Sequence, residues 1–154
     1  MAIIQVDQSG KADKVSEDTL LVAVRDGVVS LVILVKREKR EMLSEVRDPR
    51  QRKKLRFLLF AKLIFLVVEP LYKEGDTILI DNEYPGNERK IEGMLHKRFI
   101  LNAKQVINVQ ITGYENVRAA DKLSKAVRRA WRSRSIPEVD HICVATNRVL
   151  TRIK

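Results

Sequence analysis

Three aspartates stand where the chain is expected to leave a strand or enter a helix. They are Asp7 in IIQVDQSG, Asp81 in TILIDNEY and Asp121 in ENVRAADKLSKA. A buried carboxylate is unfavourable unless something pairs with it, so three that converge would require a divalent cation. The chain is otherwise strongly basic, with a formal net charge of +10, which favours polyanionic partners. A cation site in such a surface indicates binding or cleavage of a phosphodiester backbone.

The composition is that of one folded domain with a short tail. The 154 residues are 45% hydrophobic and 32% charged, which excludes a disordered chain. We expect a domain over residues 1–136 and a loosely attached C-terminal tail over residues 137–154. Cys143 is the single cysteine, which excludes an internal disulfide and indicates a reducing compartment. No secretory signal or membrane-spanning apolar run is visible, so the expected location is cytoplasmic and no membrane contact is expected.

Turn signals and β-forming residues predict a three-stranded antiparallel meander at the start of the chain. Its strands are expected at residues 2–6, 19–24 and 28–35, with the Asp26-Gly27 pair as a strong hairpin signal between the last two.

The rest of the chain alternates helices and strands. Asp48 before Pro49 is typical of a helix start, and this helix is expected to end near residue 68 or 72, with a short helix at 37–47 before it. Further elements are expected as a strand at 77–80, a helix at 87–98, a strand at 106–111 and a helix at 116–133. Residues 138–154 fit a strand followed by a helix, without a firm choice.

This order, β-β-β-α-β-α-β-α, predicts an α/β fold. The sheet is expected to be mixed and five-stranded, with helices on its faces. Functional residues in such sheets gather outside the carboxyl ends of parallel strands, which is where Asp7 and Asp81 stand.

With this order of elements and three short motifs, the chain resembles the ribonuclease H-like superfamily over residues 1 to about 133. The sequence DQSG at residues 7–10 resembles the Asp-x-Ser start of the family. The sequence DNEY at residues 81–84 is similar to its Asp-Ser-Gln-Tyr motif, and NVRAADKL at residues 116–123 resembles the opening of its last helix.

The resemblance implies a metal-dependent nuclease that hydrolyses RNA in RNA–DNA hybrids. It implies that Asp7 bridges two divalent cations, that Asp81 binds one of them and that Asp121 binds the other. Two such cations, about 4 Å apart, supply a hydroxide near neutral pH and neutralise charge on the attacking and leaving oxygens. Hard oxygen ligands favour Mg²⁺, with Mn²⁺ as a substitute.

The sequence departs from the family at the first turns of the helix after the meander. The family usually has a glutamate there, whereas residues 50–56 read RQRKKLR, and a cationic side chain would repel a metal. Asp48, Glu45 or Glu83 could substitute, but Asp48 is more simply a helix cap and Glu83 a solvated side chain. The histidine loop that the family carries before its last helix is also missing.

The expected nucleic-acid contacts combine this basic helix start with residues beside the aspartates. They are Ser9, Arg50, Arg52, Lys53, Lys54, Tyr84 and Asn116. Few aromatic residues interleave the charges, which favours backbone-directed binding of a duplex over a stacking platform for single strands. The basic runs are equally compatible with solvated helix faces.

Other interpretations stay open from the sequence. One is a DNA nuclease of the same fold, such as a junction resolvase or a transposase-like core. Another is a non-catalytic nucleic-acid-binding protein that has lost its active site, which the missing glutamate supports. Each aspartate also has a simple structural explanation, as a cap of a turn after a strand for Asp7 and Asp81, and as a helix first-turn residue for Asp121. The sequence does not indicate an oligomeric state.

Overall fold

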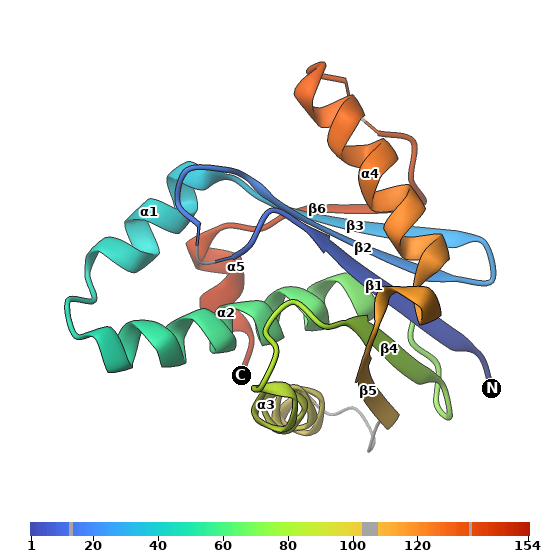
Figure 1. Ribbon diagram of the computed structural model, residues 1–154, viewed down its shortest axis with the longest axis horizontal. Helices are drawn as coiled ribbons and strands as arrows, with labels where there is room; N and C mark the ends of the chain where they lie inside the picture. The colour runs from blue at the N-terminus through green and yellow to red at the C-terminus, as the bar shows by residue number, and fades with distance from the viewer. Residues whose placement is uncertain (13, 103–107, 136) are drawn as a thin grey trace.

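The computed structural model describes residues 1–12, 14–102, 108–135 and 137–154, and in them a mixed sheet carries helices on both faces (Figure 1). The strands are β1 (Ile3–Ser9), β2 (Thr19–Arg25), β3 (Val28–Leu34), β4 (Thr77–Asp81), β5 (Asn108–Thr112) and β6 (His141–Val144). The helices are α1 (Lys36–Ser44), α2 (Pro49–Val68), α3 (Glu88–Leu101), α4 (Arg118–Arg132) and α5 (Asn147–Arg152), with a short 3-10 helix, η1 (Tyr114–Asn116), before α4.

The strand order across the sheet is β5-β4-β1-β2-β3-β6. The strands β1, β2 and β3 are antiparallel neighbours, while β4 is parallel to β1, β5 to β4, and β6 to β3. The predicted α/β class and mixed sheet are therefore confirmed. Of the strand expected at 106–111, residues 106 and 107 lie outside the described residues.

The predicted count of five strands is wrong, because the described residues form six. The additional strand β6 pairs with β3, from Ser30 opposite His141 to Ile33 opposite Val144, and so forms the edge of the sheet beyond β3. Residues 137–154 therefore do not form the loosely attached tail that we expected, since Leu150 of α5 is also buried in the core under α2. A strand of four residues at a sheet edge has too few alternating positions to be distinguished from an irregular tail by sequence.

The hairpin between β2 and β3 forms at the predicted pair of residues. Asp26 and Gly27 both have positive φ values, 48° and 80°, while Arg25 and Val28 pair across the turn. Left-handed conformations at two successive positions give the turn that matches the twist of a hairpin, and Asp-Gly adopts them at low cost.

Two hydrophobic cores lie on the two faces of the sheet. Helix α2 packs with α3 and α5 on one face, and α4 covers the other (Figure 1). The Asp48 carboxylate accepts a hydrogen bond from Arg50 N at 2.9 Å, which confirms the predicted helix cap. Under α4, the smaller core consists of Leu20, Val22, Leu31, Ile33 and Val127. The inner strands β2 and β3 are thus buried on both faces. No described helix has both the length and the apolar composition needed to span a membrane.

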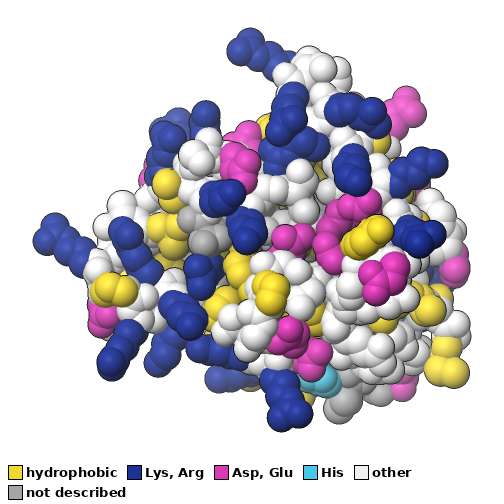
Figure 2. Space-filling view, in the orientation of Figure 1, with side chains coloured by type: hydrophobic (Ala, Val, Ile, Leu, Met, Phe, Trp, Pro, Cys, Tyr) yellow, Lys and Arg dark blue, Asp and Glu magenta, His cyan; other side chains and the backbone are white. Residues whose placement is uncertain are grey.

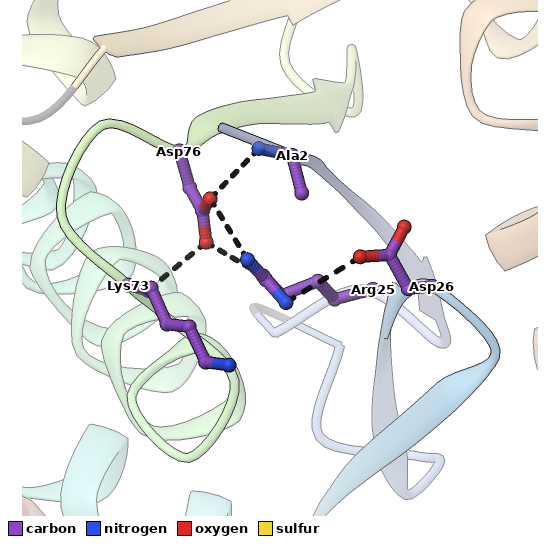
Figure 3. A network of polar contacts seen from close by, with 5 residues as sticks. All are labelled: Ala2, Arg25, Asp26, Lys73 and Asp76. Atoms are coloured by element: carbon purple, nitrogen blue, oxygen red, sulfur yellow. Dashed lines mark hydrogen bonds and ion pairs between the residues drawn. The ribbon is translucent and has the colours of Figure 1, made fainter.

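A buried carboxylate, that of Asp76, links three separate parts of the fold (Figure 3). Asp76 is 1% exposed and accepts hydrogen bonds from Ala2 N at 2.9 Å, Lys73 N at 2.9 Å, Arg25 Nε at 2.7 Å and Arg25 Nη2 at 3.2 Å. The hydrogen bond from the Arg25 side chain, with those from the two backbone amides, holds the pKa of Asp76 at about 2. The network joins the start of β1, the β2–β3 hairpin and the connection from α2 to β4.

A fully buried lysine, Lys39 of α1, holds the connection between β1 and β2. Its ammonium donates to Lys11 O at 3.2 Å, Lys14 O at 2.6 Å and Thr19 Oγ1 at 2.7 Å. A charged group that leaves water at this position requires these acceptors, and the acceptors in turn require a donor.

We expect Lys39→Met to lower the free energy of unfolding by roughly 2–4 kcal/mol, because methionine keeps the length of the side chain but leaves buried acceptors without this donor. Urea unfolding followed by circular dichroism measures the change. Lys36→Met is the matched control, since Lys36 is an exposed lysine on the same helix. Equal stability of the two variants would show that the connection does not depend on Lys39.

Candidate metal centre

Three carboxylates converge at the carboxyl end of the central parallel strands. One oxygen each from Asp7, Asp81 and Glu83 lies within 4.8 Å of the other two. The register of β1 and β4 explains the meeting of the aspartates, because Val6 pairs with Ile80 and the next residue on each strand is the aspartate. The predicted convergence of Asp7 and Asp81 is therefore found, and Glu83 joins them. We call this group the acidic cluster.

Strand alternation places the acidic cluster on the face that α4 covers. Val6 and Ile80 belong to the core on the opposite face, under α2. Successive side chains of a strand point to opposite faces, so Asp7 and Asp81 face α4. Glu83 follows Asp81 by two positions and lies in a bend beyond the end of β4, where its carboxylate meets those of Asp7 and Asp81.

The acidic cluster is electrostatically unfavourable without a cation. Burial, then the charge of Asp81 and to a smaller extent that of Asp121, raise the pKa of Asp7 to about 7. Burial, followed by the charges of Asp81 and Asp7, raises the pKa of Glu83 to about 7, although Lys11 acts against this. Among the described residues, no lysine or arginine forms an ion pair with these three carboxylates. Positive charge supplied from outside the chain would relieve the repulsion.

The donor set fits a hard divalent cation. Carboxylate oxygens are the ligands that Mg²⁺, Mn²⁺ and Ca²⁺ use in proteins, and the acidic cluster offers them without histidine or cysteine. Asp7 is 5% exposed, so the cluster is open to water mainly on the side of Asp81 and Glu83, which are half-buried. A cation held there would keep open coordination positions for a substrate.

Asp121 lies near the acidic cluster but is not one of the three converging carboxylates. Its charge reaches Asp7, whose pKa it raises, while its own Oδ2 is 3.1 Å from Lys125 Nζ one helical turn further on. Its role as a metal ligand stays a prediction.

Residues of β1 hold the first turn of α4 against the sheet. The Gln5 amide oxygen accepts from Ala119 N at 3.0 Å and from Ala120 N at 3.3 Å, and so satisfies two amides that the helix leaves open. Because Gln5 and Asp7 are two positions apart on β1, the same strand face carries the helix cap and a cluster carboxylate. The positive end of the helix dipole therefore lies on the face of the acidic cluster.

Further along α4, Arg128 locks the helix to the end of β1. Its Nε donates to Ser9 Oγ at 2.8 Å, and its Nη2 donates to Ser9 O at 2.5 Å and Asp18 O at 2.7 Å. Gly10 has a φ of +78°, and a Cβ there would lie 2.3 Å from Asp18 O and 2.6 Å from Arg128 Nη2. A glycine is thus required directly after the strand that carries Asp7.

Glu83 is the site residue that the sequence interpretation ranked too low. It was expected to be a solvated side chain, whereas it lies with Asp7 and Asp81. The available signal was its position two residues after Asp81. Of the other candidates for the missing ligand, Asp48 caps α2 and Glu45 is the exposed residue that ends α1.

Three of the predicted nucleic-acid contacts have clear partners within the protein. Ser9 accepts from Arg128, and Asn116 Nδ2 donates to Thr112 Oγ1 at 2.7 Å. Tyr84 is only 7% exposed, and its ring packs edge-on against Phe57 and Phe60 at centroid distances of 5.5 and 5.1 Å. A ring enclosed in this way differs from the open stacking group that the prediction assumed.

The predicted basic residues lie on the surface. Arg50, Arg52, Lys53 and Lys54 are exposed in the first turns of α2. A second set of exposed cations runs along α4 and consists of Arg118, Lys122, Lys125, Arg129 and Arg132. Figure 2 shows acidic side chains gathered near the middle of this face, with lysine and arginine side chains around them. The contact of the α2 residues with nucleic acid stays a prediction.

Comparisons with known proteins add little to this geometry. No family model matches the chain, and no curated protein matches it. One solved structure, that of NurA, aligns with 86% of the chain at 14% sequence identity and a TM-score of 0.30. The chain spans about 30% of the length of that NurA chain. A TM-score this low supports no conclusion about fold or function.

Proposed function

We propose that the chain is a divergent member of the ribonuclease H-like superfamily and a metal-dependent nuclease that cuts RNA in RNA–DNA hybrids. The acidic cluster carries this proposal, because its three carboxylates form no ion pair with a lysine or arginine among the described residues and are suited to a divalent ion. The central strand order supports it as well. The antiparallel meander β1-β2-β3 continues into the parallel strands β4 and β5, which is the arrangement that the element order predicts.

The roles of the three carboxylates follow from their positions. Asp7, the most buried of them, would hold the inner side of a Mg²⁺ or Mn²⁺ ion, and Asp81 and Glu83 the side open to water. Such an ion, when bound, lowers the pKa of a coordinated water and neutralises charge on phosphoryl oxygens. In this proposal Glu83 takes the place of the glutamate that α2 lacks.

The basic residues on both sides would position the substrate. A duplex that places a phosphate at the acidic cluster would meet the exposed cations of α4 on one side and those of the start of α2 on the other. Contacts of this kind bind the backbone of a duplex and are sensitive to salt. The DNEY and NVRAADKL motifs, at residues 81–84 and 116–123, favour a hybrid over a DNA substrate.

The proposal predicts that the purified protein cleaves a labelled RNA–DNA hybrid in Mg²⁺ or Mn²⁺ and leaves it intact in EDTA. We expect Glu83→Gln to slow cleavage by at least about a hundredfold, because it removes one anionic ligand of the cation. Glu74→Gln is the matched control, since Glu74 is exposed in the turn before β4, at the opposite end of that strand.

The substrates offered separate the alternatives. Cleavage of a four-way junction or a DNA duplex, with the hybrid left intact, would support a DNA nuclease instead. Salt-sensitive binding of all duplexes with no cleavage in either metal would show a binding protein without catalytic activity.

A further inference from the structure

A cavity at the start of α2 combines basic residues with apolar residues that the proposed cleavage does not use. It has a volume of about 620 Å³ and lies between α1, the first turns of α2 and the connection from β1 to β2. Its lining consists of Val15, Arg40, Leu43, Ser44, Pro49, Arg52, Lys53 and Arg56. We call it the α1–α2 pocket.

The lining of the α1–α2 pocket combines apolar walls with positive charge. Val15, Leu43 and Pro49 supply apolar surface, to which the aliphatic stems of the long basic side chains add. Four of the eight lining residues are arginine or lysine, and none is acidic. Two of the arginines also shape the pocket, because Arg40 Nε donates to Val15 O at 3.1 Å and Arg52 Nε to Val46 O at 2.6 Å.

This combination selects the chemistry of an occupant. An apolar cavity favours a flat organic group, whereas the cations favour an anion attached to it. The cations disfavour both a purely apolar ligand and a cationic one. A nucleotide has both features, since its base has two apolar faces and its phosphate is negative. The volume lies within the range of roughly 300–1,000 Å³ that is typical of small-ligand sites, which suits one nucleotide and excludes a duplex.

One side chain links the pocket to Tyr84, the residue that follows Glu83 of the acidic cluster. Arg56 lines the pocket, and its guanidinium carbon lies 5.6 Å from the ring centroid of Tyr84, the residue after Glu83. Lys11 also approaches that ring, with its Nζ 6.0 Å from the centroid, and acts on Glu83 electrostatically. A strand held at the cluster could therefore pass Tyr84 and Arg56 on its way to the pocket.

We propose that the α1–α2 pocket binds an unpaired nucleotide of the bound strand, with the base against Val15, Leu43 and Pro49 and its phosphate at Arg40 and Lys53. The proposal rests on the proposed function, because it takes the occupant from the strand that the acidic cluster would hold. It adds that the substrate is a duplex with an unpaired nucleotide next to the cleaved region.

Binding in EDTA tests the pocket without cleavage. Three labelled duplexes of equal paired length are compared by fluorescence anisotropy, one blunt and two with a single unpaired 2-aminopurine at the 5′ or the 3′ end. We expect one of the two extended duplexes to bind about tenfold more tightly than the blunt one. We also expect the 2-aminopurine emission to rise on binding, because the base leaves its stack on the duplex end.

Two variants and one control locate the effect. Ser44→Trp fills the pocket from an exposed position in the last turn of α1 and should abolish both the preference and the rise in emission. Arg40→Ala should weaken binding of the extended duplex by a factor of about 3 to 10, and more than Arg37→Ala does. Arg37 is the matched control, because it is an exposed arginine on the same helix outside the pocket lining.

The possible failures are distinguishable. Equal affinities of the wild-type protein for blunt and extended duplexes, or no binding of either, would overturn the proposal that the pocket binds a nucleotide. A preference that survives in Ser44→Trp would overturn it too. Loss of the preference in Ser44→Trp would support the pocket even if the hybrid is never cleaved. Conversely, cleavage of the hybrid with no preference for an extended duplex would support the proposed function and overturn the proposal for the pocket.

Discussion

Asp7→Asn should abolish metal-dependent cleavage and at the same time make the protein more stable. We expect the rate to fall by about a thousandfold, which corresponds to about 4 kcal/mol of lost stabilisation of the transition state. The reason is that Asp7 is the most buried carboxylate of the acidic cluster and would hold the inner side of the cation. No other described carboxylate occupies that inner position. Initial rates of hybrid cleavage in Mg²⁺ give the first measurement.

The expected gain in stability follows from the raised pKa of Asp7. Its pKa is about 7 in the folded protein, against 3.8 for a free aspartate, so between these values the folded state holds a proton that the unfolded state has lost. The free energy of unfolding of the metal-free protein should therefore fall as the pH rises from about 4 to above 7. Asparagine removes the charge, so the variant should be more stable than the wild type by roughly 2 kcal/mol at pH 8 and about equal to it at pH 4.

Urea unfolding in EDTA at both pH values checks this difference. Asp26→Asn is the control, because Asp26 is an exposed residue of the β2–β3 hairpin with a side chain 73% accessible. Added Mg²⁺ should stabilise the wild type and the control but not Asp7→Asn. Full activity of Asp7→Asn, or a loss of stability at pH 8, would show that the acidic cluster is not a metal site.

The fold was predictable wherever the signal was local. The Asp26-Gly27 turn and the Asp48-Pro49 helix start each determine an element by the conformation of two residues, and both were found where predicted. The sequence did not determine strand β6, because the strand is short and its pairing partner, β3, lies more than a hundred residues earlier. Pairing at such a separation depends on the closed fold and leaves no local pattern.

The residues of the candidate site also divide into those with a local signal in the sequence and those that depend on the folded structure. Asp7 and Asp81 were identified because each directly follows an apolar run predicted as a strand, at the carboxyl end where functional residues gather. Glu83 was not, because it lies in a bend beyond the end of β4, and its meeting with Asp7 and Asp81 depends on the folded path of the chain there. Tyr84 was expected at the surface since its neighbours are polar, yet Phe57 and Phe60 of α2 enclose it. Only the packing of α2 against the sheet reveals that contact.

Asp76→Asn should have the opposite effect to Asp7→Asn, with stability lost and activity kept. The Asp76 carboxylate is fully enclosed and accepts four hydrogen bonds on its two oxygens. Asparagine has the same shape but turns one of these acceptors into a donor, which would face either Arg25 or a backbone amide. We expect a loss of roughly 3–5 kcal/mol in the free energy of unfolding at pH 7, a large part of the total for a domain of this size.

The pH dependence distinguishes this effect from a general loss of packing. Because the pKa of Asp76 is about 2 in the folded state and higher when unfolded, its stabilisation is complete above about pH 4 and disappears as the pH falls towards 2. The difference in the free energy of unfolding between wild type and Asp76→Asn should therefore be constant from pH 5 to 7 and smaller at pH 3. A difference caused by a packing defect would be the same at pH 3. Asp26 contacts the same arginine from an exposed position, so Asp26→Asn should change the free energy of unfolding little. Below its unfolding temperature Asp76→Asn should still cleave, because Asp76 lies just before β4 and the acidic cluster at that strand's far end.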